Sequence, residues 1–174
     1  MTCKLASQKY QIPIVPVHAA GFVGGKNLGS RIAGEAVLEH LVGTKEPEIT
    51  TPYDINLIGD YNVTGDMWQY RPHLEKIGVR ILSTLSGDGR VREIRTAHRA
   101  KLNVIVCAKS LVSFTRKMQE LYNIPWISVS FFGKRDTTQS IISIVEALGD
   151  ESLMARAREV IAYEEALLEE KIAP

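Results

Sequence analysis

The alternation of short apolar runs with segments of helical period constrains the fold of this chain most strongly. Each apolar run is rich in β-branched residues and has the length of a strand, and the runs cover residues 12–17, 53–59, 79–85, 102–107 and 125–132. Segments with helical periodicity lie between or after them, at residues 27–41, 66–76, 110–122, 137–148 and 151–171. Near-continuous apolar strands separated by helices are typical of a parallel sheet covered on both faces. The sequence therefore predicts an α/β fold with a doubly wound, Rossmann-like parallel sheet.

A polar connection divides the chain. Residues 43–54 carry Pro47 and Pro52 among charged and hydroxyl side chains, which is typical of a crossing between two α/β units. We predict that residues 1–48 end one α/β domain, that 49–150 form a second, Rossmann-like domain, and that 151–174 form a C-terminal helix. Residues 1–17 offer a helix and one strand but no further strands, so we expect a piece of a longer, multi-domain subunit.

Composition excludes several classes of protein. The 21 Lys and Arg residues nearly balance the 20 Asp and Glu residues, so general attraction to nucleic acid or to an anionic membrane is not expected. No run approaches the roughly 18 apolar residues of a membrane helix, and the N-terminus lacks the apolar core of a signal peptide, so a cytoplasmic protein is expected. Cys3 and Cys107 form neither a disulfide framework nor a CxxC pair, and the four histidines lack ligand spacing. No catalytic residue is predicted, since no nucleophile with a nearby base can be identified.

The segments that follow strands are the places where chemistry is expected, because open parallel sheets bind ligands beyond the carboxyl ends of their strands. The glycine-rich segment before Lys26 is one residue too short for GxxxxGK, has Asn27 instead of Ser or Thr, and does not match GxGxxG. A tight turn into a helix is the favoured interpretation, and a nucleotide- or sugar-binding α/β domain remains an alternative. Residues 86–90, SGDGR, are interpreted as a turn.

Cys107 ends an apolar run and precedes a predicted helix. A thiol at a helix N-terminus with Lys109 nearby has its thiolate favoured, which suits a soft metal. Free cysteine is also among the most buried residue types, and one thiol is not a metal site. From spacing alone, the interpretation as a buried core residue is favoured.

Longer stretches resemble a known family. "TPYDINLIGDYNVTGDMW", "LSGDGRVREIRTAHRA", "LNVIVCAKS", "YNIPWISVSFFG" and "GFVGGKNLGSRIAGEA" resemble the nitrogenase component 1 family over nearly the whole chain. Within it, the combination of "GGKNLG", "SGDGR", "AHRA" and "VCAKS" is most similar to the α-like subunit of the scaffold that matures the iron-molybdenum cofactor. The resemblance implies that the Cys107 thiolate binds an iron of an iron-sulfur precursor of that cofactor. It also implies which residues surround the cofactor pocket: Tyr61, Val63, Lys109 and Ser110, with Lys26, Asn27 and Ser30 at the helix start that faces it.

Ser30 separates two branches of the family. The catalytic α-subunit has a histidine at the matching position, which hydrogen-bonds the cofactor, and it has a glutamine where this chain has Lys26. A serine cannot act as an imidazole acid, so the resemblance implies cofactor biosynthesis, with a catalytic nitrogenase α-subunit as the alternative. From the residues alone, Lys26 and Ser30 are also explained as the first turn of a helix.

The resemblance also implies partners. They are a NifN-like β-type subunit in a heterotetramer, the nitrogenase Fe protein, which delivers molybdenum and homocitrate, and a NifB-type cofactor donor; neither nucleic acid nor a membrane is implied. The family's N-terminal cysteines for a small interface cluster and its C-terminal sheet do not match any part of this sequence. We therefore do not expect this piece alone to hold the precursor.

Overall fold

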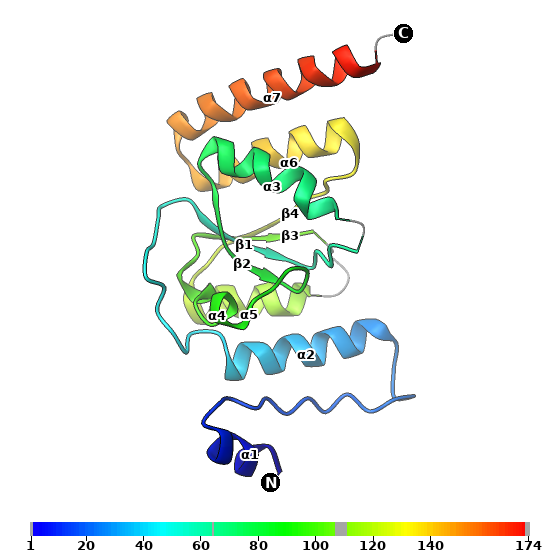
Figure 1. The fold of residues 1–174 in the computed structure, drawn as a ribbon, viewed down its shortest axis with the longest axis vertical. Coiled ribbons are helices and arrows are strands. Elements are labelled where there is room, and N and C mark those ends of the chain that lie inside the picture. The colour runs from blue at the N-terminus through cyan, green and yellow to red at the C-terminus, as the bar shows by residue number, and fades with distance from the viewer. Residues whose placement is uncertain (1, 64, 107–110, 173–174) are drawn as a thin grey trace.

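A parallel sheet forms the centre of the molecule. The computed structural model describes residues 2–63, 65–106 and 111–172. In this part of the chain the strands are β1 (Asp54–Ile58), β2 (Arg80–Leu85), β3 (Leu102–Ile105) and β4 (Trp126–Ser128). They are all parallel and lie in the order β2-β1-β3-β4, so the chain winds one way from β1 to β2 and the other way to β3 and β4 (Figure 1). The predicted doubly wound α/β fold is confirmed.

Helices cover both faces of this sheet. Those described are α1 (Thr2–Tyr10), α2 (Lys26–His40), α3 (Asp66–Ile77), α4 (Val91–Ile94), a 3₁₀ turn (Ala97–Arg99), α5 (Val112–Tyr122), α6 (Gly133–Leu148) and α7 (Glu151–Ile172). Figure 1 shows α3 and α6 on one face with α7 outside them, and α4 and α5 on the other face with α2 beyond α5. The helices expected from periodicity are all present, although their ends differ by up to four residues.

Alternate side chains of the strands build two apolar layers. Leu57 and Val104 point toward α3 and α6, whereas Ile58 and Ile105 point toward α5. Fully burying each of these side chains stabilises the fold by about 1.5–3 kcal/mol. Among the apolar residues in the predicted strand ranges, Leu57, Ile58, Val104, Ile105 and Val129 are buried, and Ile81 and Ile127 are half-buried. The last two belong to the edge strands β2 and β4, which have a neighbour on one side only.

A buried polar row crosses three strands in the α5-facing layer. Ser83 Oγ donates to Asn56 Oδ1 over 2.7 Å, and Asn56 Nδ2 donates to Asn103 Oδ1 over 2.8 Å. The same Nδ2 group donates to the carbonyl oxygen of Ala97 in the 3₁₀ turn. Asn56 lies directly opposite both Ser83 and Asn103 in the register of the sheet, so the row forms only in this alignment.

The strand predicted at residues 12–17 is wrong. This segment is described and forms no strand; it runs beside α2, away from the sheet (Figure 1). Pro13 and Pro16 have no N–H to donate, and the Ile14 N–H bonds to Ser7 Oγ instead of to a strand. The β-branched pattern was present, but a strand also needs a partner for its backbone. The division into residues 1–48, 49–150 and 151–174 stays a prediction.

The strand predicted at residues 125–132 is shorter than expected. β4 ends at Ser128, and the Ser130 N–H donates to Ser140 Oγ of α6 over 3.1 Å. The neighbouring strand β3 ends at Ile105, so ladder pairing stops there and a side chain takes the backbone donor of Ser130.

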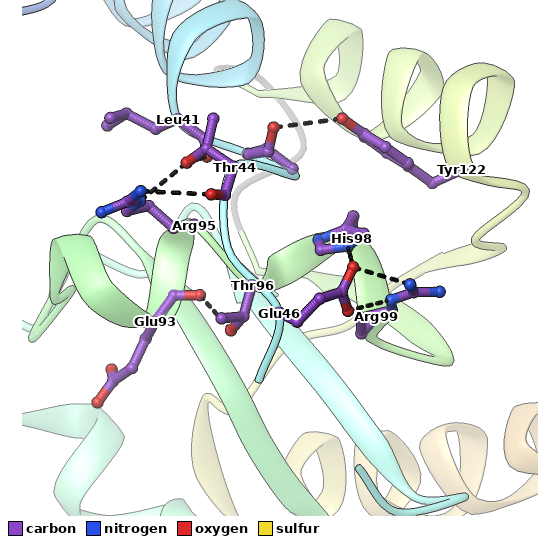
Figure 2. Close-up of polar contacts among 10 residues, drawn as sticks. Leu41, Thr44, Glu46, Glu93, Arg95, Thr96, His98, Arg99 and Tyr122 are labelled. Atoms are coloured by element: carbon purple, nitrogen blue, oxygen red, sulfur yellow. Dashed lines mark hydrogen bonds and ion pairs between the residues drawn. The ribbon is translucent and has the colours of Figure 1, made fainter. Parts of the chain in front are cut away.

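Hydrogen bonds and an ion pair join the connection between α2 and β1 to the segment that follows β2 (Figure 2). Arg95 Nε donates to Thr44 Oγ1 over 2.8 Å, and Arg99 donates to both carboxylate oxygens of Glu46 over 2.7 and 2.8 Å. His98 Nε2 lies 3.2 Å from the same carboxylate. The Arg99 and His98 hydrogen bonds lower the pKa of Glu46 from 4.5 to about 2. The "AHRA" stretch thus positions α2 relative to the sheet.

Candidate functional site

One edge of the sheet collects the positive ends of several helices. α3, α5 and α6 follow β1, β3 and β4, so they begin near the carboxyl ends of the strands. The N-terminus of α2 lies toward the same end of the molecule (Figure 1). Each helix N-terminus carries a partial positive charge. This edge therefore favours an anionic ligand.

A pocket of about 300 Å³ opens at this edge, beyond β1, β3 and β4. Its lining is largely apolar and aromatic, and it consists of Gly59, Asp60, Tyr61, Asn62, Val63, Asp66, Tyr70, Val106, Phe131 and Phe132. Ligand pockets beyond the carboxyl ends of strands, where the winding reverses, are typical of doubly wound sheets. In the sequence, Cys107 directly follows the lining residue Val106.

The buried carboxylate of Asp60 joins two parts of this pocket. It accepts hydrogen bonds from the Tyr70 hydroxyl of α3 and from the Asn62 N–H, the latter over 2.7 Å. Burial, followed by the nearby Asp60 carboxylate, raises the pKa of Tyr70, so the phenol keeps its proton. The Tyr70 ring stacks on Phe131 with ring centroids 3.7 Å apart and planes 8° from parallel.

The turn after β2 packs against the loop after β1. The Gly87 N–H donates to the carbonyl oxygen of Asp60 over 2.8 Å. A Cβ atom at Gly87 would lie 2.7 Å from the carbonyl carbon of Tyr61, so only glycine allows this approach. Asp88 accepts from Trp68 Nε1 over 2.6 Å, and hydrogen bonds from Trp68 and Asn62 lower the pKa of Asp88. The "SGDGR" stretch is a turn that supports one wall of the pocket.

The predicted site residues fall into two groups. Tyr61 and Val63 line the pocket described above, and both are exposed. Lys26 lines another pocket, of about 270 Å³, together with residues of the glycine-rich segment before α2. Asn27 lies in the first turn of α2 and is exposed. Cys107, Lys109 and Ser110 lie outside the described residues.

The face of α2 that carries Lys26 and Ser30 is turned toward α5. Lys26, Ser30 and Gly34 are four residues apart and so share one face of the helix. Gly34 is buried against α5, where a Cβ at this position would lie 3.0 Å from Leu111 Cδ2. Ser30, one turn earlier, is half-buried and lies about 6 Å along the helix axis from Gly34. Ser30 therefore lies on the same side of α2 as Gly34, which packs against the beginning of α5.

Comparison with known proteins decides the family. The family model described as "Nitrogenase component 1 type Oxidoreductase" matches residues 1–173. The chain belongs to the nitrogenase component 1 family. The resemblance found in its motifs is confirmed over the whole length of the chain.

Relatives and solved structures agree with this family. The chain is 52% identical over 172 residues to "Nitrogenase iron-molybdenum cofactor biosynthesis protein NifE" of Nostoc sp., covering 99% of this chain and 36% of that protein. It is 38% identical to the NifE protein of Klebsiella pneumoniae, covering 99% of this chain and 40% of that protein. The solved structure "Nitrogenase Cp1 at pH 5" superposes with a TM-score of 0.91 at 31% identity, covering 97% of this chain and 34% of that one. This component 1 chain thus spans about a third of the length of the proteins it matches.

Several pocket residues of this component 1 chain were not predicted from the sequence. Asp60, Tyr70, Phe131 and Phe132 line the pocket but were not among the expected site residues. Asp60 could have been found, since it follows a buried strand at the edge where ligands bind. Tyr70 carries no such signal, because its role depends on how α3 folds back over the loop.

Neither a cluster of metal-ligating side chains nor a membrane-spanning helix is found among the described residues. In the part of the component 1 chain that the structure covers, no three His, Cys, Asp or Glu side chains come together to hold a metal ion. None of the helices described combines the length and apolar composition needed to cross a bilayer.

Proposed function

We propose that this chain is part of a NifE-type scaffold subunit that holds an iron-sulfur precursor of the iron-molybdenum cofactor while the precursor is matured. The observation that carries this proposal is the pocket at the carboxyl edge of β1, β3 and β4, because Val106 in its wall is followed by Cys107. The NifE relatives, named for cofactor biosynthesis, support the same function.

In this proposal the pocket holds an anionic metal-sulfide cluster. The N-termini of α3, α5 and α6 supply positive charge at this edge, and the walls of the pocket are largely apolar apart from Asp60, Asn62 and Asp66. Lys26 lines a separate pocket at the start of α2, and in this proposal it adds an ammonium group. In this proposal the Cys107 thiolate binds one iron of the cargo. The residues that surround the cluster are Lys26, Asn27, Ser30, Tyr61, Val63, Lys109 and Ser110, and the hydroxyl and ammonium groups among them stabilise sulfide charge.

In this proposal the complete binding site also includes parts of the subunit outside this chain. The chain spans 36% of its Nostoc relative, and its described residues supply no multi-residue metal site. We propose that the remainder of the subunit closes the pocket and that a NifN-like β-type subunit completes a heterotetramer. A NifB-type protein supplies the precursor, and the nitrogenase Fe protein delivers molybdenum and homocitrate.

Ser30 favours the scaffold over a catalytic nitrogenase α-subunit. Ser30 lies in α2 and is half-buried, and the family resemblance matches it to the position at which the catalytic subunit has a histidine. A serine hydroxyl neither titrates near neutral pH nor binds a metal as an imidazole does. The family match likewise favours cluster binding over a nucleotide- or sugar-binding domain.

The test is Cys107→Ala in the full-length subunit, purified anaerobically with its partner. We expect the iron content of the large precursor cluster to fall strongly while circular dichroism stays unchanged, because alanine offers no ligand for iron. Cys3→Ala is the matched control, since Cys3 is a free, half-buried thiol on α1. A Cys107→Ala complex that keeps its large cluster, and only loses about 1 kcal/mol of stability, would contradict the proposal.

A further inference from the structure

The Asp60 carboxylate and the Tyr70 hydroxyl form a hydrogen-bonded pair in the wall of the pocket. Both side chains are almost fully buried, with exposed fractions of 8% for Asp60 and 3% for Tyr70. Neither residue was among those expected to contact a ligand, and neither offers much surface to one. Their effect on the site must therefore act through the residues they hold.

The pair connects three walls that come from different parts of the chain. Asp60 belongs to the loop after β1, and its second carboxylate oxygen fixes the Asn62 N–H of that loop. Tyr70 belongs to α3 and stacks on Phe131, which follows β4. The backbone carbonyl of Asp60 also accepts from Gly87 in the turn after β2. Loss of the Asp60–Tyr70 bond would therefore remove the link between the loop and the stacked Tyr70 ring and leave the Met67 N–H, which donates to Asn62 Oδ1 over 3.2 Å, as a hydrogen bond between the loop and α3.

The residues held in this way include those that face the ligand. Tyr61 lies between Asp60 and Asn62, and Val63 follows them, so the carboxylate sets the backbone of the segment that presents both side chains. Tyr61 and Val63 are 44% and 86% exposed, and the backbone between them is also held by the Gly87 N–H, which donates to the Asp60 carbonyl oxygen, and by the Met67 N–H, which donates to Asn62 Oδ1 over 3.2 Å. We propose that Asp60 and Tyr70 are positioning residues, which hold the loop after β1 so that Tyr61 and Val63 keep a bound iron-sulfur precursor in one orientation.

This inference rests on the proposed function. The contact between the Tyr70 hydroxyl and the Asp60 carboxylate is a charge-assisted hydrogen bond. A phenol that donates to a buried carboxylate forms a stronger bond than a neutral pair does. The raised pKa of Tyr70 keeps the donor protonated throughout the range in which such a protein is handled. The Tyr70 hydroxyl therefore stays available as the donor of this hydrogen bond.

Tyr70→Phe in the full-length complex removes this bond and keeps the ring that stacks on Phe131. Tyr53→Phe is the matched control, because the Tyr53 hydroxyl donates to Asp150 in a second Tyr–Asp pair at the amino end of β1, far from the pocket. Asp60→Asn is a second variant that keeps the shape of the side chain and removes its charge. The readouts are the electron paramagnetic resonance spectrum of the bound precursor and the rate at which a chelator removes its iron.

We expect Tyr70→Phe and Asp60→Asn to broaden or split the resonance and to speed iron release about tenfold, since a hydrogen bond to a charged group is lost. Tyr53→Phe should leave both readouts unchanged, even if it lowers the melting temperature as much. Equal spectra and release rates in Tyr70→Phe and wild type would overturn the inference and leave the proposed function standing. A wild-type complex that never carries the large cluster would overturn both.

Discussion

Replacing Gly34 with valine should separate α2 from α5 and thereby move the face that carries Lys26 and Ser30. An added Cβ at Gly34 would lie 3.0 Å from Leu111 Cδ2 and 3.6 Å from Phe114 Cδ2, and valine adds two further methyl groups in this buried contact. Overpacking of this kind destabilises by about 1–3 kcal/mol. Valine has a helix propensity about 0.4 kcal/mol better than glycine, so the expected net loss is roughly 0.6–2.6 kcal/mol.

Gly29 offers the matched position on the same helix. A Cβ at Gly29 would meet nothing within 4 Å, so Gly29→Val should gain about 0.4 kcal/mol from helix propensity without overpacking. The two substitutions are chemically identical, and their effects should have opposite signs. Only the contact with α5 distinguishes them.

Hydrogen–deuterium exchange in the full-length complex measures this difference locally. Peptides from α2 should exchange about 3- to 80-fold faster in Gly34→Val and slightly slower in Gly29→Val, because exchange follows the free energy of local opening. Iron release from the precursor should increase in Gly34→Val alone. Unchanged exchange of α2 in Gly34→Val, or equal acceleration by both variants, would refute the packing of α2 on α5 described above.

Two further substitutions test other parts of the molecule. Ser30→His in the full-length complex should not produce ammonia from dinitrogen, because Lys26 and the groups that would orient an imidazole also differ; measurable ammonia would show that the boundary between scaffold and enzyme is misplaced. Glu46 has its pKa lowered from 4.5 to about 2, so its bonds to Arg99 and His98 should contribute stability fully above about pH 4.5 and lose that contribution as the pH falls toward 2. The melting temperature of Glu46→Gln should therefore lie below that of wild type at pH 6 and approach it near pH 2. A difference in melting temperature that stays constant across this range would contradict a stabilising role for the ionised Glu46 carboxylate.

The sheet could be predicted because its strands are buried on both faces. All five residues of β1 are buried, so the run in the sequence is continuous and has the length of a strand. The run at residues 12–17 has the same β-branched residues but also contains Pro13 and Pro16, which have no backbone N–H, and its Ile14 N–H bonds to Ser7 Oγ instead of to a neighbouring strand. Periodicity thus predicts which segments are able to pair, and the partner decides whether they do.

The site was predictable only in part, for a physical reason. Tyr61 and Val63 follow a strand that the sequence reveals, so their place at the carboxyl edge could be expected. Asp60 and Tyr70 are ten residues apart, on a loop and a helix, and their contact depends on the angle at which α3 leaves that loop. The binding of iron by the Cys107 thiolate was inferred from the family resemblance, and it stays a prediction.

The polar row through Ser83, Asn56 and Asn103 also affects the shape of the pocket, although it lies in the middle of the sheet. Only three or four residues separate these side chains from Ser86, Asp60 and Val106 at the strand ends. A slip of one residue between parallel strands would displace a strand end by about 3.3 Å. A binding site tolerates errors of about 0.5 Å, so such a slip would spoil the pocket even if the apolar layers still closed. The hydrogen bonds among these three side chains in the middle of the sheet therefore fix the strand register, and the register in turn sets the positions of loops that the three side chains do not contact.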